Sequence, residues 1–180
     1  KFQLYPGKEP GTSVVVVEMT EKPRNRWTQM VDNSGNTSMG HWRSNTEFAT
    51  DNLWGRNDQL AIGYNRNLDR GTLGSLFEGV TANYSLSRGN HLWGASLAVF
   101  KTDFTLPGIN QDYLYQTRSK KSGVSYEYLL TRDQSSKLSL IAGLDFTHQR
   151  SYTQDININS QYRRLAVAYA GIKGKRYFGN

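Results

Sequence analysis

The sequence has no cysteine among its 180 residues and only 4 prolines. Without cysteine, a disulfide-stapled scaffold and thiolate-based metal or redox chemistry are excluded. No apolar run approaches the roughly 20 residues that a membrane-spanning helix needs. No signal-peptide pattern is visible at the start, so a chain that begins at Lys1 is expected to be a mature protein or a piece of a longer one.

Apolar residues are also scarce, at 37% of the chain, which makes disorder the first alternative. The 11 Tyr, 7 Phe and 4 Trp argue against disorder. High polarity, many aromatic residues and 17 Gly together are typical of a membrane β-barrel with a wet lumen and aromatic girdles. The net charge is +7, but the basic residues are scattered over strand ends and loops, so nucleic acid is not an expected partner.

The clearest periodicity in the chain lies in residues 123–147. The apolar members of the alternation are Val124, Tyr126, Tyr128 and Leu130, then Leu138, Leu140, Ala142, Leu144 and Phe146. Because strand side chains alternate between faces, this pattern predicts a hairpin with one apolar and one polar face. Its second strand, 137–147, has roughly the 9–11 residues that a tilted strand needs to cross a bilayer.

Similar alternation predicts eight strands in all. They are expected at 27–32, 40–51, 59–65, 80–86, 93–99, 123–130, 137–147 and 164–172, with a further turn at 174–179. The connections after the second, fourth and sixth strands are short, whereas the loops at 69–75, 103–112 and 151–160 are longer. Membrane barrels have short periplasmic turns and longer outer loops, so the first strand is expected to start at the periplasmic side.

The polar side chains, which alternate with the apolar ones along these strands, are expected to line a water-filled lumen. The predicted lumen-lining residues are Arg43, Asn45, Glu47, Gln59, Asn65, Thr81, Asn83, Ser85, Ser96, Ser125, Glu127, Ser139, Asp145, Thr147 and Arg164. The alternative is that they form the solvated face of a soluble sheet, and the residues alone leave both open. In a barrel, Lys or Arg on the lipid face costs about 2–4 kcal/mol near the midplane, so Arg43 and Arg164 should point inward or lie near an interface.

The N-terminal segment differs from the rest. Residues 13–20 form a largely β-branched run without clean alternation, which suits a small soluble sheet better than a lipid-facing wall. A polar hinge follows at 21–25. The sequence therefore predicts a periplasmic segment at 1–22 and the barrel portion at 23–180.

No catalytic constellation is present. His41, His91 and His148 fall at expected strand ends without ligand spacing, and no nucleophile elbow occurs. Residues 155–159 lack the Gly and Glu of a calcium-binding EF-hand loop. We therefore expect no enzyme activity, no cofactor and no metal.

The first short turn contains Asp51, Asn52, Gly55 and Asp58. Asn and Asp side chains bond their own backbone in turns, which is the simpler interpretation of this group. The alternative is a contact with a periplasmic domain or a plug, and we expect this turn to lie on the periplasmic side.

Several segments, in order, resemble a known family. They are 4–13 (LYPGKEPGTS), 31–35 (VDNSG), 51–58 (DNLWGRND), 83–86 (NYSL), 93–96 (WGAS), 163–165 (RRL) and 175–179 (KRYFG). The chain is similar to the two-partner secretion translocators, the haemolysin and haemagglutinin activator/secretion proteins of Gram-negative outer membranes. The resemblance covers the end of the last POTRA domain, a periplasmic docking module, and the start of the barrel.

The resemblance implies an all-β fold: an antiparallel transmembrane β-barrel preceded by the last strand of a POTRA domain. The chain would hold strands one to eight of a 16-stranded barrel. The family's plug helix, first POTRA domain and inward-folding loop with its Arg-Gly motif have no counterpart here.

The implied function is secretion of a large exoprotein, unfolded, through the lumen without nucleotide. The implied partners are an exoprotein with an N-terminal secretion domain and outer-membrane lipid. The exoprotein could be a haemolysin, an adhesin or a contact-dependent toxin. The alternatives are a small eight-stranded outer-membrane barrel that acts as an adhesin through its loops and, least favoured, a barrel enzyme.

Overall fold

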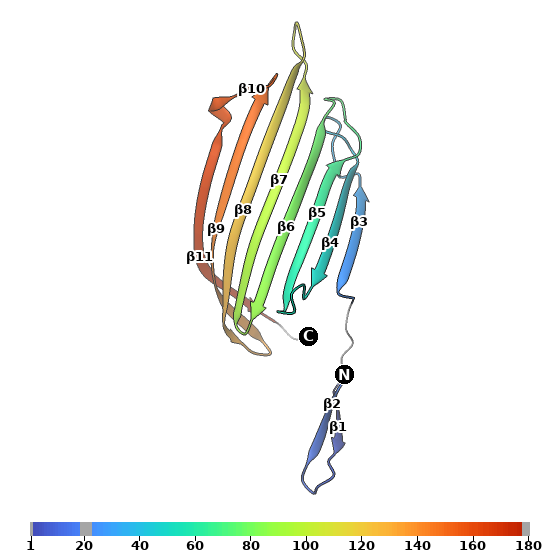
Figure 1. The fold of residues 1–180 in the computed structure, drawn as a ribbon, viewed down its shortest axis with the longest axis vertical. Coiled ribbons are helices and arrows are strands. Elements are labelled where there is room, and N and C mark those ends of the chain that lie inside the picture. The colour runs from blue at the N-terminus through green and yellow to red at the C-terminus, as the bar shows by residue number, and fades with distance from the viewer. Residues whose placement is uncertain (1, 19–22, 178–180) are drawn as a thin grey trace.

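The structure is a computed structural model that describes residues 2–18 and 23–177. It holds two antiparallel sheets (Figure 1). The smaller one pairs β1 (Phe2–Pro6) with β2 (Ser13–Val17). Of the predicted 13–20 strand, residues 19 and 20 lie outside the described residues, as do 21 and 22 at the predicted domain boundary.

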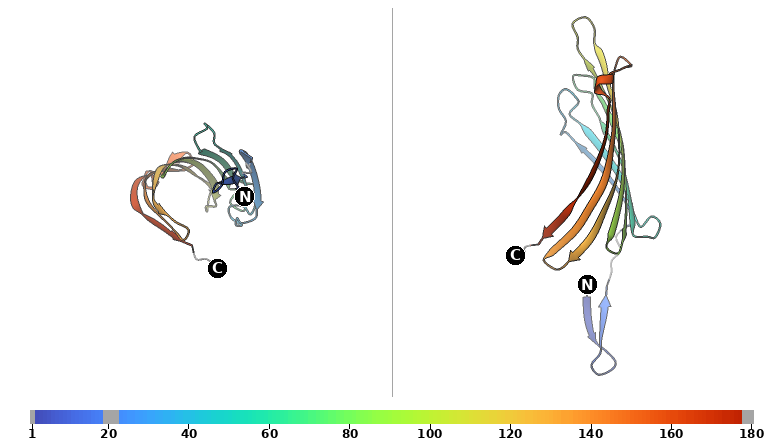
Figure 2. Two further views of the ribbon diagram at one scale, coloured as in Figure 1. Left: turned by 90° about the horizontal axis from the view of Figure 1, so that it is seen from below. Right: turned by 90° about the vertical axis from the view of Figure 1, so that its left-hand side faces the viewer.

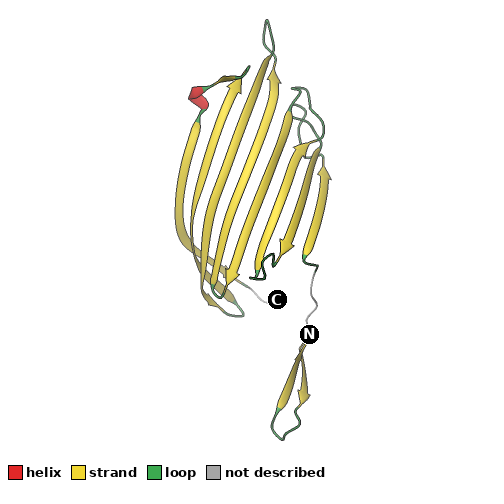
Figure 3. Ribbon diagram, viewed as in Figure 1, coloured by secondary structure: helices red, strands yellow, loops and turns green. Residues whose placement is uncertain are grey.

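The larger sheet contains almost all of the remaining chain. Its strands are β3 (Asn25–Asp32), β4 (Arg43–Asp51), β5 (Asp58–Asn67), β6 (Leu76–Arg88), β7 (His91–Leu106), β8 (Tyr113–Arg132), β9 (Ser136–Thr153), β10 (Ile156–Asn157) and β11 (Arg163–Arg176). Each long strand pairs with its sequence neighbour, and both β10 and β11 pair with β9. The only helical element among the described residues is the short 3-10 helix η1 (Asn159–Gln161), drawn red in Figure 3.

The large sheet is curled rather than flat, and it does not close within this chain (Figure 2). The edges are β3 at one side and β11 at the other. β8, at 20 residues, is the longest strand. No described helix is long and apolar enough to cross a membrane.

The register divides the sheet into two faces. Because side chains directly opposite in a ladder share a face, the rows of paired residues can be followed across it. One face carries Asn45, Asn65, Thr81, Ser96, Gly123 and Asp145, and we call it the polar face. The other carries Ile62, Ala82, Leu97, Val124, Tyr126 and Leu144, and we call it the apolar face.

The sheet has almost no apolar core. Among the described residues, Ala49 is the only buried hydrophobic side chain. On the apolar face, Val124, Leu140 and Leu144 are 53%, 42% and 45% exposed. Large apolar patches left exposed in this way mark a surface that another apolar phase covers, and a lipid bilayer is such a phase.

Several predicted boundaries were wrong. The predicted loop at 103–112 begins only after β7 ends at Leu106, and β9 extends to Thr153 inside the predicted 151–160 loop. The predicted turn at 174–179 was wrong at its start, because Gly174 pairs with Leu138 and the ladder continues to Arg176. In each case the alternation of polar and apolar residues ends before the strand does. The neighbouring strand still supplies backbone hydrogen-bond partners there, so strand pairing, rather than the local sequence pattern, determines where the strand ends.

Candidate functional site

The polar face gathers nearly all of the predicted lumen-lining residues. These are Arg43, Asn45, Glu47, Gln59, Asn65, Thr81, Asn83, Ser85, Ser96, Ser125, Glu127, Ser139, Asp145 and Thr147. Their rows are continuous from β4 to β9, so the set forms one surface. The register brings these side chains to one face.

The prediction that Arg164 shares this face was wrong. Arg164 pairs with His148 on the apolar face, and the neighbouring Arg163 pairs with Gln149 on the polar face. A one-residue change of register moves every side chain of a strand to the opposite face. Here Tyr169 lies over Gly143, where an added Cβ would come within 2.4 Å of the ring, and this fit pins β11 to β9.

Glycine residues are concentrated on the polar face. Within the long strands, the glycines of this face are Gly63, Gly79, Gly94, Gly123, Gly143 and Gly171, and only Gly174 lies on the apolar face. At Gly79 an added Cβ would lie 2.3 Å from Phe100, and at Gly123 it would lie 2.4 Å from the Asp145 carboxylate. Neighbouring side chains thus occupy the space that these glycines leave, and the face stays shallow.

An ionic group with a part-buried carboxylate lies on the polar face where β8, β9 and β11 meet. The Glu127 side chain is 13% exposed, and its carboxylate accepts hydrogen bonds from Lys137 Nζ at 3.0 Å and Lys173 Nζ at 3.2 Å. One carboxylate between two ammonium groups leaves this region with excess positive charge. The sequence analysis singled out Glu127 but missed both lysines, because Lys137 and Lys173 come together only through the register.

The first turn holds the chain that enters β3. The Arg24 guanidinium donates to the backbone oxygens of Asp51 at 3.0 Å and Leu53 at 2.7 Å, and also to that of Asn52. Arg26 forms an ion pair with Asp51, which also accepts from Gln59 Nε2 at 2.8 Å. The end of the predicted hinge and the start of β3 are therefore bound to the turn, and sequence reasoning missed this role of Arg24.

Within the same turn, Asp58 is only 2% exposed. Its carboxylate accepts from the backbone N–H groups of Trp54 at 3.2 Å and Arg56 at 3.4 Å, and from Tyr84 Oη at 3.3 Å. Asn52 and Gly55 adopt positive φ angles of 56° and 71°. Asn52, Gly55 and Asp58 thus act in turn chemistry, whereas Asp51 joins the turn to Arg26 of β3.

Aromatic residues gather at the turn end of the apolar face. Trp54 packs on Tyr84 with ring centroids 5.3 Å apart, and Trp93 packs on Tyr126 at 4.3 Å. His91 Nδ1 lies 2.7 Å from Tyr126 Oη, so this histidine belongs to the aromatic group. At the other end, His148 meets the Tyr162 ring edge-on at 5.2 Å. Aromatic belts at both ends of an apolar band are typical of proteins that span a bilayer.

The loops at 33–42 and 68–75 form one packed unit, which the sequence analysis missed. Asn67 Nδ2 donates to the backbone oxygens of Met39 at 3.1 Å and Ser75 at 2.9 Å, and its Oδ1 accepts from Phe77 N at 2.7 Å. The backbone N–H groups of His41 and Trp42 donate to the Asp69 carboxylate and lower the pKa of Asp69. The density of Asn, Asp, Ser and Gly in these loops was the available signal.

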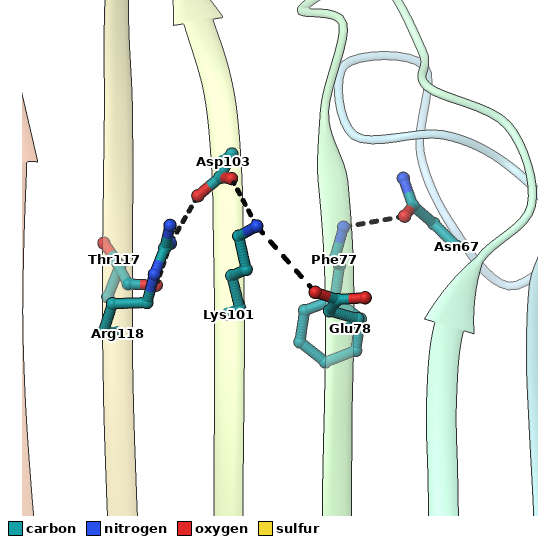
Figure 4. A network of polar contacts seen from close by, with 7 residues as sticks. All are labelled: Asn67, Phe77, Glu78, Lys101, Asp103, Thr117 and Arg118. Atoms are coloured by element: carbon teal, nitrogen blue, oxygen red, sulfur yellow. Dashed lines mark hydrogen bonds and ion pairs between the residues drawn. The ribbon is translucent and has the colours of Figure 1, made fainter. Parts of the chain in front are cut away.

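Beside this unit, the apolar face ends in a charged network (Figure 4). Lys101 Nζ lies 3.4 Å from Asp103 and 3.9 Å from Glu78, and Arg118 also pairs with Asp103. Within the described part of the chain, no group of three or more His, Asp or Glu residues could hold a metal ion.

These features define a class. Long antiparallel strands, one apolar and one polar face, aromatic belts and the absence of an apolar core among the described residues are those of a transmembrane β-barrel wall. A family model described as "Haemolysin secretion/activation protein ShlB/FhaC/HecB" matches residues 11–180. The chain belongs to this family, which confirms the family predicted from the sequence.

Known relatives agree with this assignment. The chain is 27% identical to the outer membrane transporter CdiB-2 of Burkholderia pseudomallei (strain 1026b), over 99% of this chain and 31% of that protein. Among solved structures, CdiB from Escherichia coli matches with a TM-score of 0.86 at 20% identity, over 99% of this chain and 33% of that one. CdiB from Acinetobacter baumannii matches with a TM-score of 0.83 at 22% identity, over 100% and 34%.

These structures support the predicted fold, an all-β antiparallel barrel portion. The chain spans about a third of the length of each relative.

Proposed function

We propose that this chain is part of the wall of an outer-membrane translocator that secretes a large exoprotein partner. The observation that carries the proposal is the division of one continuous sheet into an exposed apolar face and a polar face rich in glycine and serine. The polar face lines the lumen and the apolar face meets lipid acyl chains. Arg164 is excepted from the lumen set, because it lies on the apolar face.

The polar face suits passage of an unfolded polypeptide. A chain in transit exposes its backbone N–H and C=O groups, which need hydrogen-bond partners that hydrocarbon cannot supply. A lumen lined by Asn83, Ser96 and Ser125 holds water that can hydrogen-bond those groups. No nucleotide is needed for this role, and the exoprotein carries an N-terminal secretion domain.

The orientation follows from the connections and the N-terminal hairpin. The turn ends of the sheet are joined by 52–57, 89–90 and 133–135. At the other ends, the 33–42, 68–75 and 154–162 connections are longer, and 107–112 is as long as 52–57. We assign the turn ends to the periplasm, together with residues 1–22 as the end of a POTRA domain. Arg24 then fixes the junction between that domain and the barrel portion, 23–180.

The test uses the full-length protein that contains this chain. In planar bilayers it should open water-filled channels, and its deletion should abolish export of the exoprotein. For the lumen itself, Ser125→Cys and Val124→Cys form a matched pair, one residue apart on opposite faces of β8.

A thiol-reactive crosslinker on Ser125→Cys should trap an exoprotein stalled during export, whereas Val124→Cys should trap none. Absence of conductance and of the export defect, or equal crosslinking from both positions, would contradict the proposal.

A further inference from the structure

The apolar face becomes strongly basic at its loop end. The basic side chains there are Lys101, Arg118, Lys120, His148, Arg150 and Arg164, and Glu78 and Asp103 share the face with them. Directly toward the strand centres, the same face carries Leu97, Phe146 and Ala166. On β9 and β11 the face changes from apolar to basic within one step of two residues, from Phe146 to His148 and from Ala166 to Arg164, whereas on β7 Val99 lies between Leu97 and Lys101.

Among the described residues, carboxylates pair with only two of the five Lys and Arg side chains of this cluster. Asp103 pairs with Lys101 and Arg118, and Glu78 also pairs with Lys101. In the described ranges, no carboxylate lies within ion-pair distance of Lys120, Arg150 or Arg164. Arg150 instead lies over the Tyr162 ring, 5.6 Å from its centroid. Lys120 and Arg164 therefore remain available to an external anion.

The surface around these cations is hollowed in two adjoining places. The first hollow, about 380 Å³, is lined by Arg118, Lys120, His148, Arg150 and Tyr152. The second, about 630 Å³, shares Lys120 and His148 with the first. It adds Arg164 and the apolar side chains of Leu97 and Phe146. A cationic hollow that continues into an apolar one fits an amphiphile with an anionic head.

We propose that this basic cluster binds the phosphate groups of a lipid in the outer leaflet, with the lipid's acyl chains lying along Leu97 and Phe146. Arginine and lysine form strong charge-assisted hydrogen bonds with phosphate, and clusters of them beside an apolar surface are typical of sites for anionic lipid headgroups. The proposal rests on the proposed function, because it needs the apolar face to meet lipid and the loop end to lie outside.

A lipid fits better than a soluble anion because of the second hollow. A free phosphate could use only the cations and would make no contact with Leu97 and Phe146. A lipid phosphate brings its own apolar chains to the same place, and a headgroup with two phosphates could engage Lys120 and Arg150 together. The structure thus assigns Arg164 a role on the outside of the wall.

The test compares two double variants of the full-length protein. Lys120→Gln/Arg164→Gln removes two cations from the basic cluster. Arg43→Gln/Arg163→Gln removes two cations from the loop end of the polar face, and neither residue lines the two hollows. Both variants lose the same charge at the loop end of the sheet. Heat-modifiable gel migration shows that each variant is folded.

Binding is measured with purified bisphosphorylated lipid A, with the same lipid after removal of its phosphates, and with an acyl-free sugar bisphosphate. The Lys120→Gln/Arg164→Gln variant should bind lipid A roughly thirtyfold more weakly than the wild type does, since each of the two lost cations contributes about 1 kcal/mol near an anionic lipid surface. The control variant should bind within about twofold of the wild type. Dephosphorylated lipid and acyl-free bisphosphate should both bind weakly.

Three results would overturn the proposal: equal loss in both variants, no preference for the phosphorylated lipid, or tight binding of the acyl-free bisphosphate. The last would show a soluble anion as the ligand. Channel conductance of the wild-type preparation is recorded in parallel. If the protein conducts but shows no preference for the phosphorylated lipid, only the proposed lipid site is contradicted. If the protein does not conduct, the proposed translocator function itself is contradicted.

Discussion

The polar and apolar faces of the large sheet are built by the same strands, one residue apart, yet they differ in how they use side-chain volume. On the polar face, glycines such as Gly79 and Gly143 make room for Phe100 and Tyr169. On the apolar face, Val124, Leu97 and Leu144 project from the sheet and remain about half exposed. The side chains of the polar face thus pack against one another, whereas those of the apolar face need an apolar medium outside the protein to cover them.

The largest effect should come from placing a charge on the apolar face. Val124→Arg is expected to cost about 2–4 kcal/mol in the free energy of unfolding from lipid vesicles, because the guanidinium must enter hydrocarbon. Ser125→Arg, on the opposite face of β8, should cost far less. Denaturant titration of both full-length variants gives the comparison, and equal costs would show that the two faces meet the same environment.

The packing of the polar face is tested at its glycines. Gly79→Ala should cost about 1–3 kcal/mol, because the added Cβ would lie 2.3 Å from a ring carbon of Phe100 and force the ring to move. Gly171→Ala is the control, since its Cβ would lie 3.7 Å from Ile141 in ordinary contact. If Phe100→Ala fails to reduce the penalty at Gly79 in the double variant, the proposed steric cause is incorrect.

Asp58 is an exception on the apolar face, and its effect should be intermediate. Asp58→Ala removes the acceptor for the Trp54 and Arg56 N–H groups and is expected to lower the unfolding midpoint by a few degrees. Tyr84→Phe removes only one of its hydrogen bonds and should have a smaller effect. The comparison is made by thermal melts followed by gel migration. A larger loss for Tyr84→Phe than for Asp58→Ala would contradict the view that the Asp58 carboxylate holds the turn mainly through the Trp54 and Arg56 N–H groups.

The smallest effect is expected at Asp133, in the turn between β8 and β9. The Ser135 N–H and the Ser136 hydroxyl lower the pKa of Asp133 to about 2. A carboxyl with a depressed pKa stabilises the folded state above its unfolded pKa of about 4, and this stabilisation is lost as the pH falls through about 2. Amide hydrogen exchange at Ser135 should therefore speed up below about pH 4 relative to intrinsic rates, and Asp133→Asn should flatten that dependence. A carboxyl titration by NMR with a midpoint near 4 would contradict the prediction.

Much of the two-faced wall could be predicted from the sequence, because period-two alternation is strong in the strands from Arg43 to Thr147. The face of β11 was predicted wrongly, because Leu165 and Val167 alternate with alanines as a lipid-facing strand would. The pairing with β9 instead places Leu165 and Val167 on the polar face. The Glu127 ion pairs and the Asn67 loop unit were also beyond reach, since both depend on residues that only tertiary register brings together.

The most direct test of the account is a single-cysteine scan along β9, which is straightforward in a chain segment that contains no cysteine. Nitroxide labels at residues 140–147 of the full-length protein in bilayers report access to oxygen, which concentrates in lipid, and to a nickel chelate, which stays in water. The account predicts alternation with a period of two: oxygen access at Leu140, Ala142, Leu144 and Phe146, and nickel access at Ile141, Gly143, Asp145 and Thr147. Nickel access on both faces, or on neither, would contradict a wall with lipid on one side and water on the other.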